Sequence, residues 1–150
     1  MHEGTRHRGQ VVNGVPQSPW LEAVKWDDKG LVAAVAQDVT SLEVLMLAWM
    51  NRESLQLTLT TGDAHYWSRS RQALWKKGGT SGHIQHVKEL RLDCDGDAIL
   101  MKVEQVDNIA CHTGRRRCFF NLLEDGRWVA KDEISDGTRP CTSTSIGANG

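Results

Sequence analysis

The sequence predicts an α+β domain built mainly from antiparallel sheet, with two short helices near its N-terminal part. From residue 64 onward, short runs alternate apolar and polar side chains between turn-forming residues, which is typical of half-buried strands. Before residue 63, helix-capping residues and an apolar stripe at helical spacing indicate helices instead. Helices and strands that are segregated along a chain favour the α+β class.

A hairpin and a helix are the first elements expected. Residues 20–26 and 31–37 flank the turn-forming group Asp-Asp-Lys-Gly, so these segments are predicted to pair as a hairpin. Thr40 and Glu43 have the spacing of a capping box, which predicts the start of a helix. The apolar stripe of that helix consists of Leu42, Leu45, Met46 and Trp49.

A second short helix and a series of strands are expected to follow. Asn51 is a suitable N-cap for this helix, and Gly62 marks its end. A glycine-containing loop is expected at residues 74–83. The strand-like runs are HYWSRS, IQHVKELRLDCD, AILMKVEQV, CFFNLL and RWVA, the last two joined by a turn at residues 124–126.

Length and charge fit one ordinary soluble domain. The chain has 150 residues and a formal net charge of -1, so it offers no overall basic field for nucleic acid or an anionic membrane. Its longest apolar run, residues 44–50, is far shorter than the roughly 20 residues of a membrane-spanning helix. No apolar segment of a secretory signal follows the N-terminus. We expect a cytoplasmic protein whose folded domain covers residues 20–130, with flexible tails at 1–19 and 131–150.

Three aspartates at alternate positions form the first candidate site. If the preceding strand continues through Asp93, Asp95 and Asp97, its period of two places the three carboxylates on one face. Like charges repel unless a cation lies among them, and carboxylate oxygens favour magnesium or calcium. A solvated acidic turn is the alternative interpretation. An EF-hand is rejected because Ala98 stands where its loop needs glycine and the following residues are strand-like.

Cysteines form the second candidate site. In a reducing compartment, Cys94, Cys111 and Cys118 are expected to be free thiols or metal ligands. Their wide spacing requires either the fold or a subunit boundary to bring them together. Zinc held by three thiolates keeps a fourth position open for water, as catalytic zinc sites do. Three unrelated buried cysteines are the alternative, and Cys141 is interpreted as a tail thiol.

Histidine supplies a candidate for proton transfer. His112 directly follows Cys111 and would lie beside a metal held there, where an imidazole can donate or accept a proton. A structural role is the alternative. His65, His83 and His86 are expected to be sheet or loop residues that could also reach a metal.

Basic and hydroxyl side chains form the third candidate site. Arg69 and Arg71 lie two residues apart, so on a strand they would share a face and could each bind a phosphate. Lys76 precedes a glycine-containing loop in which Thr80 and Ser81 offer hydroxyls to an anion. The group indicates a phosphorylated small-molecule ligand, and a charged sheet face beside a flexible loop is the alternative. The sequence contains no recognised nucleic-acid-binding motif.

Five segments of the chain carry a resemblance to a known family. In chain order they are VLMLAWMN, TGDAHYWSRSR, LWKKGGTSGHIQHV, LDCDGDAIL and ACHTGRRRCFF. Together they resemble, in the same order, the phosphoribosyl-AMP cyclohydrolase family of histidine biosynthesis. The zinc ligands that the resemblance implies are Cys94, Cys111 and Cys118. The magnesium ligands that it implies are Asp93, Asp95 and Asp97. It also implies an intertwined homodimer in which the first of these cysteines completes the zinc site of the other chain.

The resemblance implies an activity as well. The family opens the adenine ring of 1-(5-phosphoribosyl)-AMP by hydrolysis to the formimino carboxamide ribotide, and zinc-activated water would be the nucleophile. His112 would transfer protons, and the basic and hydroxyl residues named above would hold the two phosphates. We expect a monofunctional enzyme. The alternatives are a zinc-dependent nucleotide deaminase, whose H-x-E and P-C-x-x-C signatures are absent, and a zinc-stabilised module that binds nucleotides or RNA.

Overall fold

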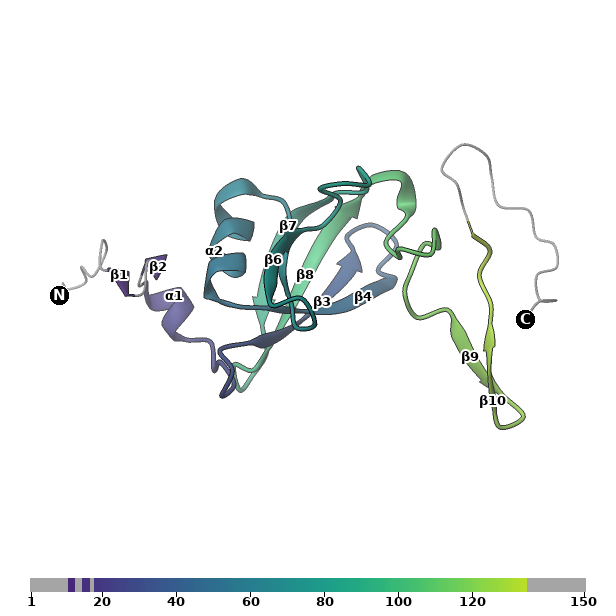
Figure 1. Ribbon diagram of the computed structural model, residues 1–150, viewed down its shortest axis with the longest axis horizontal. Coiled ribbons are helices and arrows are strands. Elements are labelled where there is room, and N and C mark those ends of the chain that lie inside the picture. Colours follow the sequence, from purple (N-terminus) through teal and green to yellow (C-terminus); the bar gives the residue numbers. More distant parts are fainter. Residues whose placement is uncertain (1–10, 13–14, 17, 135–150) are drawn as a thin grey trace.

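The computed structural model describes residues 11–12, 15–16 and 18–134. Its centre is a six-stranded sheet (Figure 1). The strand order is β6-β5-β4-β3-β8-β7. The strands are β3 (Val32–Asp38), β4 (Val44–Met50), β5 (His65–Ser68), β6 (Ala73–Lys76), β7 (Gln85–Leu92) and β8 (Ala98–Gln105). Neighbouring strands are antiparallel except β3 and β8, which run parallel in the middle of the sheet. The predicted α+β class with mainly antiparallel sheet is therefore confirmed.

Smaller elements surround this sheet. Helix α2 (Arg52–Thr61) packs against β5. The hairpin of β9 (Asn121–Glu124) and β10 (Arg127–Ala130) stands away from the sheet in Figure 1. The remaining elements are β1 (Val11–Val12), β2 (Val15–Pro16), helix α1 (Pro19–Glu22) and the 3-10 helix η1 (Val106–Asn108). In the part of the chain that the structure describes, no helix has the length and apolar character needed to cross a membrane.

The sheet curls so that two of its distant strands meet at one corner. The amide of Ala64 donates to the Gln85 carbonyl at 3.0 Å, and the amide of Val87 donates to the Gly62 carbonyl at 2.7 Å. These bonds join the segment before β5 to the start of β7, although β4, β3 and β8 lie between those strands in the sheet. Fully buried side chains of the core include Leu45, Met50, Tyr66 and Met101.

The predicted hairpin of residues 20–26 and 31–37 is wrong. The first segment lies partly in helix α1, for which Pro19 suits the first turn because its fixed backbone angle is already helical. The turn between the segments does form, since the Asp27 carboxylate accepts the amide of Leu31 at 2.9 Å. That turn leads into β3, whose neighbours are β4 and β8.

The helix predicted to begin at Thr40 is also wrong, because the segment with the apolar stripe is strand β4. The amide of Thr40 donates to the Asp38 carboxylate at 3.1 Å, within the turn that joins β3 to β4. Strand β4 lies between β3 and β5, and its sequence VLMLAWM is apolar throughout, although Val44 and Leu47 are exposed. Such a run also contains the helical spacing, so the pattern alone could not distinguish the two structures.

Helix α2 confirms the second predicted helix and both of its ends. The Asn51 side chain accepts the amide of Ser54 at 2.8 Å, and the Ser54 hydroxyl accepts the amide of Asn51 at 2.9 Å. Gly62 follows the helix with φ 81°, a left-handed conformation that favours glycine. The Thr58 hydroxyl accepts the amide of His65 at 2.9 Å, which fixes the helix against the start of β5.

Replacement of Asn51 by alanine is expected to lower the free energy of unfolding by about 1 kcal/mol, because the Ser54 amide loses its side-chain acceptor. Urea-induced unfolding of the variant and the parent protein measures the difference. Asn51→Asp keeps an acceptor oxygen and is the matched control, with an expected change within about 0.5 kcal/mol. An alanine variant as stable as the parent would contradict the capping role.

Candidate functional site

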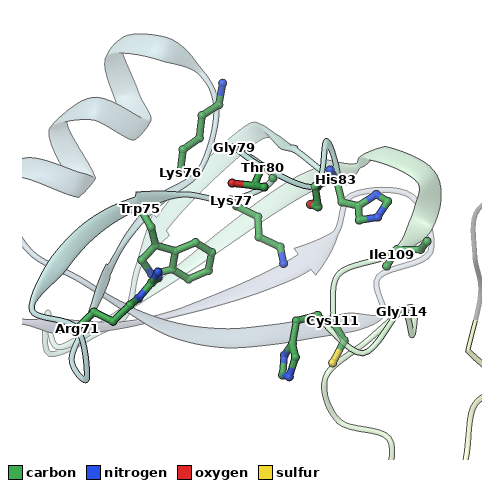
Figure 2. Close-up of a pocket in the computed structure, with 13 residues that line it drawn as sticks. Arg71, Trp75, Lys76, Lys77, Gly79, Thr80, His83, Ile109, Cys111 and Gly114 are labelled. Atoms are coloured by element: carbon green, nitrogen blue, oxygen red, sulfur yellow. Dashed lines mark hydrogen bonds between the residues drawn. The ribbon is translucent and has the colours of Figure 1, made fainter.

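A pocket of about 450 Å³ lies between the segment that follows β6 and the segment that follows η1 (Figure 2). The first wall carries cationic and hydroxyl side chains, among them Arg71, Lys76, Lys77, Thr80, Ser81 and His83. The second wall includes Ile109, Cys111, His112 and Gly114. Anion-binding groups and a thiol with an adjacent imidazole therefore face the same space.

Gly78 determines the shape of the loop on the first wall. Its φ is 82°, and a Cβ atom there would lie 2.5 Å from the carbonyl carbon of His83. The amide of Gly82 donates to the Gly78 carbonyl at 2.8 Å, which closes the loop into a tight turn. Only glycine fits at this position, and the resulting turn exposes the hydroxyl residues Thr80 and Ser81.

A buried hydrogen-bond chain connects the core to this loop. Tyr66, fully buried on β5, donates its hydroxyl to Gln85 Oε1 at 2.7 Å, and Gln85 Nε2 donates to Gln105 Oε1 at 2.9 Å. Gln105 Nε2 then donates to the His83 carbonyl at 3.0 Å. Burial raises the pKa of Tyr66, so its hydroxyl remains a donor. Because buried polar groups need partners, this chain fixes β5, β7 and β8 relative to the pocket loop.

Two of the predicted cysteines lie close together near the second wall. The Thr113 hydroxyl donates to Cys111 Sγ at 3.1 Å, and the amide of Cys118 donates to the Leu45 carbonyl at 2.7 Å. Burial opposes ionisation of Cys111, but hydrogen bonds, the first of them from Thr113, and the charge of Lys77 lower its pKa overall. Burial and the neighbouring Cys111 raise the pKa of Cys118 to about 11. The pair therefore favours one thiolate over two unless further positive charge is present.

Lys77 is a candidate functional residue that sequence reasoning missed. Its ammonium donates to the carbonyl of Ala110, directly before Cys111, and lies 5.9 Å from the centre of the Trp75 ring. Burial lowers the pKa of Lys77, while Cys118 and Cys111 act in the opposite direction. This lysine joins the two walls of the pocket. In the sequence it is one half of a Lys-Lys pair, and nothing in the local pattern distinguishes it from its neighbour.

The aspartate site lies in a turn and not on a strand as predicted. Residues 93–97 connect the end of β7 to the start of β8. Carboxylate oxygens of Asp93, Asp95 and Asp97 nevertheless lie within 4.8 Å of one another, the one such acidic, histidine or cysteine cluster among the described residues. Hydrogen bonding to Asp93, then to Asp95, raises the pKa of Asp97. This crowding of hard oxygen ligands suits a divalent cation such as magnesium.

Cys94 is not near the other two cysteines within one chain. It is exposed in the turn before β8, whereas Cys111 and Cys118 follow β8. Strand β8 has eight residues, which span roughly 25 Å. The amide of Cys118 bonds to Leu45, near the end of β4 that is remote from this turn. The fold of a single chain therefore does not bring the three cysteines together.

Most of the predicted phosphate ligands line the pocket, but one does not. Those that line it are Arg71, Lys76, Thr80 and Ser81. Arg69 lies elsewhere, with its guanidinium 4.7 Å from the centre of the Trp49 ring. The two arginines do not share a strand face as expected, because β5 ends at Ser68 and both lie in the turn that follows.

The histidines of the described residues divide into two groups. His112 and His83 line the pocket. His65 Nδ1 lies 2.8 Å from the Asp63 carbonyl oxygen, and His86 Nδ1 lies 2.8 Å from the Asp63 carboxylate. These last two are therefore sheet residues that stabilise the corner where β5 and β7 meet. Cys141 and most of the predicted tails lie outside the described residues.

Together these features are those of an enzyme site for a phosphorylated small molecule, with groups suited to hydrolysis. The family model described as phosphoribosyl-AMP cyclohydrolase matches residues 46–120, which contain both pocket walls and the aspartate turn. The chain belongs to the phosphoribosyl-AMP cyclohydrolase family.

Relatives that match over most of their length agree with this assignment. A phosphoribosyl-AMP cyclohydrolase of Chromobacterium violaceum is 66% identical over 115 residues, which cover 77% of this chain and 87% of the relative. One from Azoarcus sp. is 64% identical over 116 residues, 77% of this chain and 88% of the relative. One from Marinobacter nauticus is 56% identical over 120 residues, 80% of this chain and 87% of the relative.

Lys77→Met is expected to destabilise the protein by about 1–3 kcal/mol, because the buried Ala110 carbonyl loses its donor. The change is measured by urea-induced unfolding. Lys76→Met is the matched control, since Lys76 is exposed and its contact with Asp63, at 3.5 Å, is a surface ion pair worth about 0–1 kcal/mol. Equal stability of the two variants would show that Lys77 does not hold the second wall.

Proposed function

We propose that this pocket catalyses the hydrolytic opening of the adenine ring of 1-(5-phosphoribosyl)-AMP in histidine biosynthesis. The supporting observation is that one pocket combines a cationic, hydroxyl-bearing loop with Cys111 and His112, in a chain of the cyclohydrolase family. The bond that breaks joins ring nitrogen one to carbon six. The exocyclic amine stays on carbon six, so the product is a formimino carboxamide and no ammonia is released.

The first wall binds the phosphates in this proposal. Arg71 and Lys76 supply positive charge, and Thr80 and Ser81 supply hydroxyl donors at the exposed turn. A substrate with two phosphates carries enough negative charge to engage both cations. Arg69 is left out of the binding group because its guanidinium stacks on Trp49.

Zinc is proposed to bind at Cys111 and Cys118, with Cys94 of a second chain as the third ligand. The donor set fits, because two thiols lie together and the pKa of Cys111 is lowered even without a metal, since the hydrogen bonds and the Lys77 charge outweigh burial. Zinc in such a site supplies a water activated as a nucleophile at neutral pH. The carboxylates of the 93–97 turn are likewise proposed to hold magnesium.

A homodimer would complete the zinc site. The exposed apolar side chains of the β9–β10 hairpin support such an assembly, and they are Leu122, Leu123 and Trp128, the last 71% exposed. The hairpin stands away from the sheet in Figure 1. Large exposed apolar groups that gather on one element mark an interaction surface. We propose that this hairpin packs on a second copy of the chain and that the zinc site is shared across the interface.

His112 is the proposed proton acceptor for the attacking water. It follows Cys111 and lines the pocket, so its imidazole lies beside the position where the nucleophile is generated. As the water oxygen bonds to carbon six, one water proton passes to this imidazole. The two walls then hold the base and the phosphates of the substrate in a fixed relation, because Lys77 links them through the Ala110 carbonyl.

The activity is tested by supplying 1-(5-phosphoribosyl)-AMP with zinc and magnesium and following ultraviolet absorbance and free ammonia in the same reaction. Ring opening without ammonia is the expected result. Ammonia release would instead indicate a deaminase. If a folded, zinc-loaded protein gave neither ring opening nor ammonia, the proposed function would be overturned.

Variants separate metal binding from proton transfer. Cys111→Ala is expected to lose both zinc and turnover, because a thiolate ligand is removed. His112→Ala is expected to retain zinc but to lower kcat by roughly 10²-fold to 10⁴-fold, the usual effect of losing an acid-base group. Zinc content is measured by mass spectrometry and kcat by the absorbance assay, with Cys141→Ser as the control that retains both. Full turnover by a zinc-free variant would contradict the proposed role of the metal.

A further inference from the structure

We propose that His83 is a second catalytic residue, which protonates the leaving ring nitrogen, and that Asp107 is its positioning residue. The inference rests on the proposed function above. His83 lines the pocket, and its Nδ1 lies 3.1 Å from Asp107 Oδ2. A carboxylate that binds one imidazole nitrogen fixes the orientation of the ring and leaves the other nitrogen, Nε2, available for proton transfer.

The backbone of His83 is fixed on three sides. Its amide donates to Ser81 Oγ at 3.2 Å, and its carbonyl accepts Gln105 Nε2 from the buried chain at 3.0 Å. Its carbonyl carbon lies so close to Gly78 that a Cβ there would approach to 2.5 Å. An acid-base group must be held within hydrogen-bond reach of its target, and this histidine has the required anchoring.

The backbone at Asp107 is left-handed, a conformation that is strained for most residues and that aspartate and asparagine adopt more readily than other residues with a side chain. Asp107 has φ 63° and Asn108 has φ 56°, so two consecutive residues adopt the left-handed conformation. Glycine would adopt this conformation without strain but would supply no carboxylate. Arg116 Nη1 donates to Asn108 Oδ1 at 2.9 Å, which helps to hold the turn. Strained backbone beside a pocket points to a function of the side chain that it places.

The two histidines serve different walls. Figure 2 shows His83 and Cys111 on separate sides of the pocket. The attacking water and His112 belong to the side of Cys111. The leaving nitrogen carries a phosphoribosyl group. Of the two phosphates, we place the one on this group at Thr80 and Ser81, which lie in the same loop as His83. The proton donor therefore lies on the side of the ring where the leaving nitrogen is attached to its sugar.

Ring opening needs a proton at the leaving nitrogen. In the cationic form of the N1-substituted adenine, the water oxygen bonds to carbon six and one water proton passes to His112. The bond between carbon six and nitrogen one then breaks, and its electron pair stays on nitrogen one. Nitrogen one takes a proton from His83 Nε2, while the oxygen on carbon six releases its remaining proton to solvent and becomes the carboxamide carbonyl. No oxidant or other co-reactant is required.

Steady-state kinetics of His83→Gln and Asp107→Gly test this assignment. His83→Gln is expected to lower kcat by roughly 10²-fold to 10⁴-fold while KM changes less than about threefold. Asp107→Gly is expected to lower kcat at least about tenfold while the Tm stays the same or rises, because glycine removes both the carboxylate and the backbone strain. If Asp107 had only a structural role, its replacement would lower kcat only together with the Tm. Leu42→Gly is the matched control, since Leu42 also has positive φ, at 68°, but lies in the turn between β3 and β4 and does not line the pocket, and its kcat should be unchanged.

Several outcomes would overturn the inference. A raised KM with unchanged kcat in His83→Gln would make His83 a binding residue. Full kcat in Asp107→Gly would refute the positioning role of Asp107. If His83→Gln does not fold, the kcat of Asp107→Gly alone decides whether the inference stands. Failure of the parent protein to open the ring would refute the proposed function itself. If the parent protein opens the ring and His83→Gln does so with the same kcat, only the assignment of His83 is refuted, and the proposed function stands.

Discussion

The Tyr66 hydroxyl is buried and therefore needs a hydrogen-bond partner, and this requirement links the core to the pocket. Its bond to Gln85 begins the chain that ends at the His83 carbonyl. The hydrogen-bond chain connects β5 to the neighbouring strands β7 and β8. Because β4 and β3 separate β5 from these two strands in the sheet, the chain also secures the corner where the sheet curls together. The pocket loop is therefore anchored to the rigid core through the His83 carbonyl. From the same wall as His83, the Lys77 ammonium donates to the Ala110 carbonyl of the opposite wall and holds the segment that carries Cys111.

The length of β8 is the second constraint. It separates the aspartate turn and Cys94 from the segment that contains Cys111 and Cys118. A site with all three thiolates then needs a second chain, and the exposed apolar side chains of the β9–β10 hairpin are the surface proposed to contact it. In that arrangement neither chain alone holds a complete zinc site. Activity would therefore require the dimer, because the zinc ligands come from both chains.

The sequence predicted those parts of the molecule in which local chemistry decides the structure. Asn51 and Gly62 delimit helix α2 because caps act within a few residues, and the later strands follow from alternation. The prediction from the sequence was wrong at β4, because a strand that is apolar at every position also contains the apolar spacing of a helix. The motifs indicated most of the pocket side chains, but Lys77 and the pairing of His83 with Asp107 depend on contacts between distant segments, which no local pattern encodes. Arg69 lies outside the pocket lining, and the end of β5 at Ser68, which separates it from the expected strand face, could not be foreseen.

A shared site between two chains is the central claim, and complementation tests it most directly. Cys94→Ser and Cys118→Ser are each expected to be inactive, but co-expression of the two should restore activity. Random assembly makes half of the dimers mixed, and each mixed dimer has one intact site, so the preparation should reach about a quarter of the parent activity. Co-expressed Cys111→Ser and Cys118→Ser form the control, which should stay inactive because both substitutions fall on the same side of the interface. An inactive mixture of Cys94→Ser with Cys118→Ser, at normal dimer content, would contradict the shared site.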